Sequence, residues 1–371
     1  MARRMSSARL VRSSDLLVYW DAKGLIVKDL AGKSGVDATP EVLFILDRFS
    51  RPRTPASVVN ALSEYEAGSV LAAIRALRRL RLLLPADEGR RRGSRIRAWK
   101  GNLASALYHV ASRDMTYIAD PAKSEEAFRT QIAVHPRPAR FKRYPASVRR
   151  PLLSKKRGGC GTDLDDVLGH RRTVREFTRE PVEFEDFAAA IGRTWGRTGW
   201  IDAGEFGLYA TKTSPSAGAL HPIECYVLAW NVRSLPPGLY HYDVAADELR
   251  RLRSGNLSSA AVRAASGQRW VGRAAFLCVL TAVFTRSLWK YGQENAYRDV
   301  WLDAGHLAQT FCLLATSRGL GPFTTVALQD SYIEALIGLD GVREFPVYLC
   351  GAGKPARSLA RSLNSGSRSV R

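Results

Sequence analysis

Apolar positions in the first 95 residues form short runs and helical stripes. Residues 16–20 and 25–27 are two apolar runs around turn-forming residues, which predicts a pair of strands. Two Thr-Pro pairs, at 39–40 and 54–55, each precede an apolar stretch, and proline is favoured in the first turn of a helix. A third helix is predicted at 69–83, followed by a short closing strand. The side of that helix that we predict to be buried carries Val70, Ile74, Leu77 and Leu80.

Beyond residue 158, helical and strand patterns alternate. Short helices are predicted at 164–168 and 184–191, and the apolar runs at 224–230 and 275–283 predict strands. Near the end of the chain, a strand is predicted at 347–350 and a long helix at 301–317. The predicted stripe of that helix is Leu302, Gly305, Ala308, Gln309, Cys312 and Ala315. The simplest architecture for this half is an α+β fold, in which a mixed sheet is wrapped by helices.

The net charge of +21 is concentrated towards the N-terminus. Residues 1–100 carry 20 basic and 10 acidic side chains, residues 101–160 carry 12 and 4, and residues 161–371 carry 24 and 21. Part of the excess is an arginine run at 90–95, which we interpret as a linker. Such a field attracts polyanions or an acidic peptide, and a role in solubility alone is the alternative.

Composition also suggests where the chain divides. Residues 137–157 contain nine Lys or Arg and no Asp or Glu, together with several prolines, which predicts an extended and exposed connection. We therefore predict a winged-helix-like domain at 1–95, a helix and basic Pro-rich linker at 96–157, a catalytic domain at 158–357, and a disordered tail at 358–371.

Cysteine spacing and hydropathy exclude several classes of protein. The five cysteines lie at least 34 residues apart and form no C-x-x-C pair, so we predict structural thiols and no metal site. No apolar run approaches the roughly 18 residues needed to cross a bilayer. The basic first residues are not followed by the apolar segment of a secretory signal. The protein is therefore predicted to be cytoplasmic and not associated with a membrane.

A basic cluster with a hydroxyl follows the helix predicted at 164–168. Its guanidinium forks and hydroxyl suit the phosphate and ribityl chain of a flavin mononucleotide (FMN). Further along the chain, Ala217 and Gly218 are small enough for the backbone to approach the edge of the flavin ring. An arginine cluster alone is usually a solvated face, but its pairing with this small-residue loop favours a flavin site. The members of the cluster are Arg171, Arg172, Thr173 and Arg175.

Five motifs occur in the order typical of one enzyme family. They are Ser214-Pro215-Ser216-Ala217-Gly218-Ala219-Leu220-His221-Pro222, Gly238-Leu239-Tyr240-His241-Tyr242-Asp243, Lys290-Tyr291-Gly292 with Tyr297-Arg298, Ala304-Gly305-His306-Leu307-Ala308-Gln309, and Arg318-Gly319-Leu320-Gly321. With these motifs, residues 158–357 resemble the nitroreductase family, and specifically the SagB-type azoline dehydrogenases. The resemblance implies a nitroreductase fold, one FMN per active site at a homodimer interface, and oxidation of a thiazoline or oxazoline ring in a ribosomally made precursor peptide to the azole, or of a related backbone bond.

The same resemblance implies roles for individual residues. Lys290 and Tyr291 match the catalytic pair of the family, with Lys290 as the proton acceptor and Tyr291 relaying the proton or steering the ring. We expect the pKa of Lys290 to be lowered by partial burial and by the nearby arginine cluster. The alternative is a solvated lysine beside a packing tyrosine. The implied FMN-binding residues are Arg171, Arg172, Thr173, Arg175, Pro215, Ser216, Ala217, Gly218, Gln309, Gly319, Leu320, Gly321, Lys354 and Arg357.

The N-terminal unit resembles the small recognition elements that hold the leader of a precursor peptide in peptide-modifying enzymes. Two alternatives stay open for it. The arginines of the third helix, Arg75, Arg78 and Arg79, could contact DNA, or they could simply face solvent. We favour peptide binding, with nucleic acid as the less favoured partner and a cyclodehydratase or other modifying enzyme as a further partner.

Two other functions compete with peptide dehydrogenation. An NAD(P)H-dependent nitro or flavin reductase is disfavoured by the Lys290-Tyr291 pair and by Gly218, which stands where many reductases have asparagine. A non-catalytic scaffold that binds peptide or partner enzymes is disfavoured by the intact basic cluster at 171–175.

Overall fold

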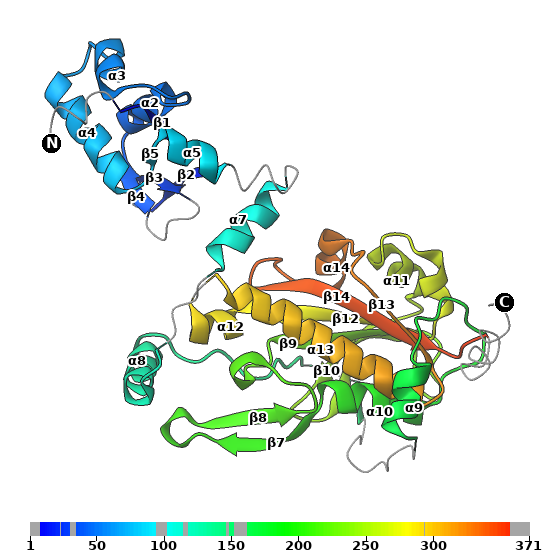
Figure 1. The fold of residues 1–371 in the computed structure, drawn as a ribbon. Coiled ribbons are helices and arrows are strands. Elements are labelled where there is room, and N and C mark those ends of the chain that lie inside the picture. The colour runs from blue at the N-terminus through cyan, green and yellow to red at the C-terminus, as the bar shows by residue number, and fades with distance from the viewer. Residues whose placement is uncertain are drawn as a thin grey trace. The chain divides into compact units, whose positions relative to one another are not determined.

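The computed structural model describes residues 8–22, 24–29, 35–93, 102–113, 118–145, 148–151, 162–292 and 294–356. The chain divides into two compact units, residues 1–116 and residues 117–371 (Figure 1). Within the described ranges, no helix is both long and apolar enough to cross a membrane. The predicted tail at 358–371 lies outside the described residues.

The first unit contains a three-stranded antiparallel sheet of order β2-β3-β4, a short pair of strands β1 and β5, and a group of helices. Its elements are β1 (Leu10–Arg12), β2 (Leu16–Asp21), β3 (Gly24–Asp29), β4 (Gly35–Ala38), α2 (Pro40–Arg48), α3 (Pro55–Ala61), α4 (Ala67–Arg79), β5 (Leu83–Pro85), α5 (Ala86–Arg92) and α7 (Leu103–Ala111). The predicted strand pair and both Thr-Pro helix starts are confirmed, because Pro40 and Pro55 each begin a helix.

Two sequence expectations for this unit were wrong in detail. Helix α4 ends at Arg79 rather than at 83, because the amide of Leu82 bonds to the carbonyl of Leu77 with Arg81 in the left-handed region at φ 60°. Glycine usually occupies that position, so the arginine gave no sign in the sequence that the helix ends there. Leu80, which we predicted to be buried, is exposed. The arginine run that we interpreted as a linker begins inside α5.

The second unit is built on a seven-stranded sheet of order β13-β14-β12-β9-β10-β11-β6. Its elements are α8 (Pro121–Val134), β6 (Arg149–Pro151), α9 (Leu164–His170), α10 (Phe184–Trp195), β7 (Arg197–Asp202), β8 (Leu208–Lys212), β9 (Ile223–Ala229), β10 (Gly238–Asp243), β11 (Glu248–Ser254), α11 (Ser258–Ala264), β12 (Phe276–Val283), α12 (Phe284–Tyr291), α13 (Ala296–Ser317), β13 (Gly321–Thr325), α14 (Asp330–Ile337) and β14 (Glu344–Gly353), with short 3-10 turns η2 (Gly204–Phe206), η3 (Ala217–Ala219) and η4 (Arg269–Arg273). The α+β class is confirmed, but every pairing between the described strands of this sheet is antiparallel, whereas we expected a mixed sheet.

Helices cover both faces of the sheet, as Figure 1 shows for α13 on one side and α11 and α14 on the other. Strand β9 is therefore buried along its whole length. Cys225 and Val227 face α10 and α13, while Tyr226 and Leu228 face α11 and α14. Burial on both faces explains why the sequence of this strand reads as one continuous apolar run.

Helix α13 buries half of the stripe that we predicted, namely Ala308, Cys312 and Ala315. Leu302 is 60% exposed, and Gly305 and Gln309 are also exposed. The buried face is Ala296, Val300, Asp303, Ala304, Leu307, Ala308, Phe311, Cys312, Ala315 and Thr316. A charged residue inside this stripe, Asp303, obscured its 3.6-residue period in the sequence.

The basic segment that we expected to be an exposed connection contributes to the second unit. Residues 149–151 form β6, which pairs with β11 at the edge of the sheet. Upstream of β6, Lys142 is about three-quarters buried and contacts the sheet. The charge of this segment therefore serves local contacts as well as the surface.

Candidate functional site

Most of the residues predicted to bind a phosphate gather at one edge of the second unit. Residues 171–178 lie against the start of β13 and the residues that follow β14. The amide of Val174 donates to the carbonyl of Pro322 (2.9 Å), and the amide of Thr178 donates to that of Lys354 (2.9 Å). We call the set Arg171, Arg172, Thr173, Arg175, residues 319–321 and Lys354 the basic edge.

Two glycines allow the backbones at this edge to approach closely. A side-chain carbon on Gly321 would lie 2.8 Å from Cβ of Val174, and one on Gly353 would lie 2.9 Å from Cδ1 of Phe177. Gly319, at φ 66°, occupies the left-handed position that ends α13. Leu320, which we predicted to contact the cofactor, is fully buried and packs in the core beneath this edge.

The arginines of the basic edge carry charge that the described part of the chain does not neutralise. No carboxylate among the described residues pairs with Arg171, Arg172 or Arg175. Arg172 and Arg175 are exposed, and Arg171 is half-buried. Together with Lys354, they form a cationic surface suited to a phosphate.

The second group of predicted residues surrounds loop 214–222. Ser216 donates a hydrogen bond from Oγ to Oδ2 of Asp303 (2.5 Å), and the amide of Ala217 lies 3.4 Å from Oδ1 of the same carboxylate. Ser214 and Thr310 join their hydroxyl groups at 2.7 Å, which ties the start of the loop to α13. Pro215 is exposed beside these anchors.

Gly218 brings the loop against the predicted catalytic pair. It lies at φ 58°, and a side-chain carbon on it would lie 2.7 Å from Oη of Tyr291 and 3.0 Å from Nζ of Lys290. Helix α12 presents both side chains from its last turn, and it ends at Gly292, which is also in the left-handed region. The loop and the pair are thus in direct contact.

Lys290 lies among aromatic rings. Its Nζ is 5.3 Å from the ring centre of Phe128 and 5.8 Å from those of Tyr209 and Tyr291. The guanidinium of Arg137 lies 4.1 Å from the ring centre of Tyr209. Burial lowers the pKa of Lys290, and the charge of Arg137 lowers it further. The cation near Lys290 is therefore Arg137, rather than the arginine cluster that we expected.

Burial has the opposite effect on the two neighbouring acids. It raises the pKa of the Tyr291 phenol, which therefore stays protonated at neutral pH. It also raises the pKa of Asp303 to about 6, although the hydrogen bonds from Ser216 and Ala217 oppose the shift.

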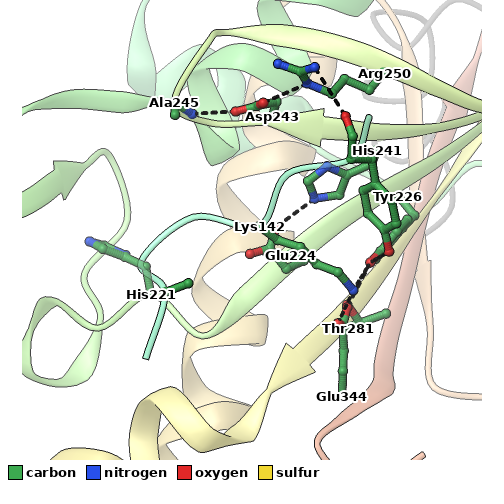
Figure 2. A network of polar contacts seen from close by, with 12 residues as sticks. Lys142, His221, Glu224, Tyr226, His241, Asp243, Ala245, Arg250, Thr281 and Glu344 are labelled. Atoms are coloured by element: carbon green, nitrogen blue, oxygen red, sulfur yellow. Dashed lines mark hydrogen bonds and ion pairs between the residues drawn. The ribbon is translucent and has the colours of Figure 1, made fainter. Parts of the chain in front are cut away.

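A buried polar network lies next to loop 214–222 (Figure 2). Glu224 accepts from Nε2 of His241 (2.8 Å) and pairs with the guanidinium of Arg286 (2.7 Å). Burial by itself would raise the pKa of Glu224, but Arg286 and His241 outweigh it and lower the pKa to about 2. Arg286 also donates to the carbonyl of His221 (3.2 Å), so the network supports the end of the loop.

A second part of Figure 2 ties the basic segment to the sheet. Lys142 donates to Oη of Tyr226 (2.8 Å) and pairs with Glu344. Glu344 also accepts from Tyr226 (3.0 Å) and from the hydroxyl of Thr281 (2.7 Å). Every polar group of this part has a partner, so we assign it a structural role.

The structure thus forms two groups from the predicted site residues. No hydrogen bond, ion pair or ring contact in the described part of the chain links the basic edge to the group around Gly218 and Lys290. Gln309 is exposed on α13, and Arg357 lies outside the described residues.

The thiols agree with the structural interpretation. Four cysteines, Cys225, Cys278, Cys312 and Cys350, are free and buried, and burial raises the pKa of Cys312 to about 12. Cys160 lies outside the described residues.

Sequence reasoning missed four charged residues of the site, Asp303, Glu224, Arg286 and Arg137. Asp303 and Glu224 each had a usable signal, because a charged residue lies within an otherwise apolar buried stripe or strand. Arg137 had none, since its contact with Tyr209 joins residues far apart in the chain.

Comparison with known proteins identifies the fold and the family. The chain is 27% identical to the trifolitoxin operon protein TfxC of Rhizobium leguminosarum bv. trifolii over 307 residues, 80% of this chain and 85% of that protein. It is 24% identical over 328 residues to the trifolitoxin-processing protein TfxB of the same organism, 82% of this chain and 85% of that protein.

A solved structure and a family model complete the comparison. The crystal structure of a protein described as a nitroreductase from Anabaena variabilis matches with a TM-score of 0.53 and 22% identity, over 69% of this chain and 47% of that chain, which supports the fold alone. The model of the nitroreductase family matches residues 168–354, a range that contains the basic edge, loop 214–222 and the Lys290-Tyr291 pair. The chain belongs to the nitroreductase family.

Proposed function

We propose that this protein is an FMN-dependent dehydrogenase that oxidises a thiazoline or oxazoline ring of a ribosomally synthesised precursor peptide to the azole. The observation that carries the proposal is the contact of Gly218 with Lys290 and Tyr291. In this contact, a lysine of lowered pKa and a phenol that remains protonated, both at the end of α12, lie against the small-residue loop.

The residues present fit FMN. The basic edge offers three arginines without carboxylate partners among the described residues, together with Thr173 and Lys354, which suits the phosphate and ribityl chain. At the loop, Ala217 and Gly218 have little or no side chain, which suits a close approach of the backbone to the edge of a flavin ring. When bound, FMN would supply the acceptor for the hydride, which carries both electrons away from the azoline.

The protein's own residues would handle the proton. Aromatising an azoline removes one hydride and one proton, and Lys290 would take the proton from the ring carbon onto Nζ. A lowered pKa keeps a larger fraction of Lys290 neutral and able to accept it. Tyr291, protonated, would donate a hydrogen bond that orients the substrate ring.

A second copy of the chain would complete the site. The basic edge and the group around Gly218 are not linked within the described part of one chain, so a homodimer in which one copy brings its basic edge to the other's loop would join them. Exposed apolar side chains on α12 and α13, Leu288, Trp301 and Leu302, are consistent with such an interface.

The first unit is proposed to hold the precursor. Its strand β2 lies at a sheet edge and exposes Val18, Tyr19 and Trp20, the last by 74%. An extended peptide can pair with such an edge and place side chains on exposed aromatic rings. The similarity to a trifolitoxin-processing protein supports a processing role, and we propose a cyclodehydratase or another modifying enzyme as partner and the cytoplasm as location.

Single-turnover flavin reduction tests the proposal. Full-length protein with bound FMN is mixed without oxygen with a synthetic peptide that carries one thiazoline. The flavin band at roughly 450 nm should bleach while the peptide loses two hydrogens, as read by mass spectrometry. Lys290→Ala should keep FMN but react at least about 10²-fold more slowly, because a positioned base typically contributes 10²- to 10⁴-fold.

Two results would contradict this function. A wild-type protein whose flavin is not reduced by thiazoline or oxazoline peptides, but is reduced rapidly by NAD(P)H, would favour the nitro or flavin reductase alternative. A protein that binds the precursor but retains no flavin under any condition would favour a scaffold.

A further inference from the structure

Asp303 is a buried carboxylate whose place in the chemistry is not explained by the catalytic pair. It is 4% exposed and lies within the apolar stripe of α13 that packs on the sheet. Both of its oxygens face loop 214–222, where they accept from the hydroxyl of Ser216 and the amide of Ala217. The hydroxyl of Ser216 in turn accepts from the amide of His221 (2.9 Å). One carboxylate therefore organises the loop from Ser216 to His221.

The loop needs such an anchor because its backbone is strained. Ala219 and His221 have φ angles of 52° and 47°, in the left-handed region that residues with a side chain rarely adopt. Gly218, between Ala217 and Ala219, is at 58°. Strained conformations persist only where surrounding contacts over-determine them. Here those contacts are Asp303 at one end and Arg286 at the other.

We propose that Asp303 is a positioning residue, whose carboxylate fixes loop 214–222 and thereby sets Gly218 against Lys290 and Tyr291. The role of that pair in turnover rests on the proposed function. The anchoring of the loop does not, because it follows from contacts within this chain alone.

Several ionisable groups face Asp303. Asp299 and His306 lie one turn away on α13, Tyr291 lies on α12, and Lys212 lies on β8. Burial raises the pKa of Asp303 to about 6 against the opposing effect of His306, and Asp299 adds to the rise. Burial also lowers the pKa of Lys212 to about 8, so this lysine is largely charged where Asp303 ionises.

The ionised carboxylate is a disadvantage for stability. The folded chain binds the proton of this carboxyl more tightly than the unfolded chain does, because the pKa of Asp303 is higher when folded than its ordinary 3.8. The free energy of unfolding therefore falls as the pH rises from about 4 to above 6. A group that lowers stability at neutral pH is expected to serve function. Asparagine, which has nearly the same shape, would remove the charge and one of the two acceptor oxygens, so the charge-assisted hydrogen bond from the Ser216 hydroxyl would be lost.

The test compares Asp303→Asn with Asp299→Asn in full-length, FMN-loaded protein. Asp299 provides a matched control, because the substitution removes a carboxylate one turn away on the same helix and near the same phenol. Three quantities are measured at pH 5 and pH 8: hydrogen exchange of the peptide covering loop 214–222, the midpoint of thermal unfolding, and single-turnover flavin reduction by the thiazoline peptide.

Three results are expected for Asp303→Asn and not for the control. Loop exchange at pH 8, corrected for intrinsic rates, rises about tenfold or more while exchange in α13 does not. The thermal midpoint at pH 8, relative to pH 5, rises by a few degrees more than in the control, because Asp303 is buried whereas Asp299, whose pKa burial also raises, is only partly buried. Flavin reduction at pH 8 slows by about tenfold or more, and the ratio of the rates at pH 8 and pH 5 becomes smaller than in the wild type.

Failure of the inference can be told apart from failure of the function. Unchanged loop exchange in Asp303→Asn overturns the inference, whether or not the peptide is oxidised. Wild-type protein that does not oxidise the peptide overturns the proposed function, while loop exchange still decides the anchor. If Asp303→Asn does not fold, the wild-type protein provides the test. Hydrogen exchange of loop 214–222, corrected for intrinsic rates, must then rise as the pH falls through about 6, and exchange that does not change with pH overturns the inference.

Discussion

Replacing Gly218 by alanine separates backbone strain from displacement of the catalytic pair. At φ 58° an alanine costs about 1 kcal/mol relative to glycine. Its methyl carbon would also lie 2.7 Å from Oη of Tyr291 and 3.0 Å from Nζ of Lys290, closer than such atoms pack. Both atoms are the ends of flexible side chains, so they move aside at little further cost to folding. The catalytic atoms, however, are the ones that move.

Gly204 provides a matched control in the same unit. It has nearly the same backbone angle, φ 60°, and a side-chain carbon there would meet nothing within 4 Å. We therefore expect Gly204→Ala and Gly218→Ala to lower the free energy of unfolding by a similar amount, about 1 kcal/mol. Restoring an ordinary contact of about 3.4 Å moves the Tyr291 hydroxyl by roughly 0.7 Å. Displacements of about 1 Å cost up to about 10²-fold in rate, so only Gly218→Ala should slow turnover, by about 10- to 100-fold.

The assay combines urea unfolding with single-turnover flavin reduction on the same preparations. Equal stability losses with a rate loss confined to Gly218→Ala are expected. If Gly218→Ala reacts within about threefold of Gly204→Ala, the contact of the loop with Lys290 and Tyr291 does not set the active geometry. A stability loss that exceeds the control by more than about 2 kcal/mol would mean that the side chains cannot move aside as assumed.

Three further predictions use other parts of the chain. The double variant Arg171→Ala, Arg175→Ala should release FMN, since each charge-assisted phosphate contact contributes about 1.5 to 3 kcal/mol. Arg343 is exposed, so Arg343→Ala should retain FMN, and full FMN occupancy in the double variant would mean that the phosphate binds elsewhere. The pKa of Glu224 is about 2 in the folded chain, so its ionised form contributes about 3 kcal/mol to the free energy of unfolding above pH 4.5, and this contribution is lost as the pH falls towards 2. Glu224→Gln should therefore flatten that part of the curve of unfolding free energy against pH, and an unchanged curve would refute the assignment. Trp20→Ala should weaken binding of a labelled precursor peptide about tenfold in fluorescence anisotropy without changing flavin content, whereas tight, salt-sensitive binding of a DNA duplex with no peptide binding would favour the nucleic-acid alternative.

Local signals explain which elements could be predicted. The Thr-Pro pairs begin α2 and α3 because proline suits the first turn whatever lies around it. Strands β9 and β12 were found because burial on both faces leaves an unbroken apolar run. The end of α4 was missed because Arg81 adopts a backbone conformation that usually requires glycine.

The residues of the candidate site also separate into those that the sequence indicated and those that it did not. Side-chain chemistry indicated the arginine cluster and the order of the motifs indicated the Lys290-Tyr291 pair as candidate site residues, and the range matched by the family model contains both. Sequence patterns did not show that Arg137 approaches Lys290 across the ring of Tyr209. The segment of Arg137 reads as a basic, proline-rich connection, and nothing local distinguishes it from a solvated one.

The sequence by itself determined the α+β class, the helices α9, α10 and α13, the strands β9, β12 and β14, and the residue types available for chemistry, because these depend on short-range periodicity and side-chain chemistry. Only the tertiary structure decided which charges are buried together and which backbone is strained. Asp303 faces loop 214–222 across 86 or more positions of sequence. Its pKa and that of Lys290 follow from burial and from neighbours contributed by other elements, and those exist only once the chain has folded.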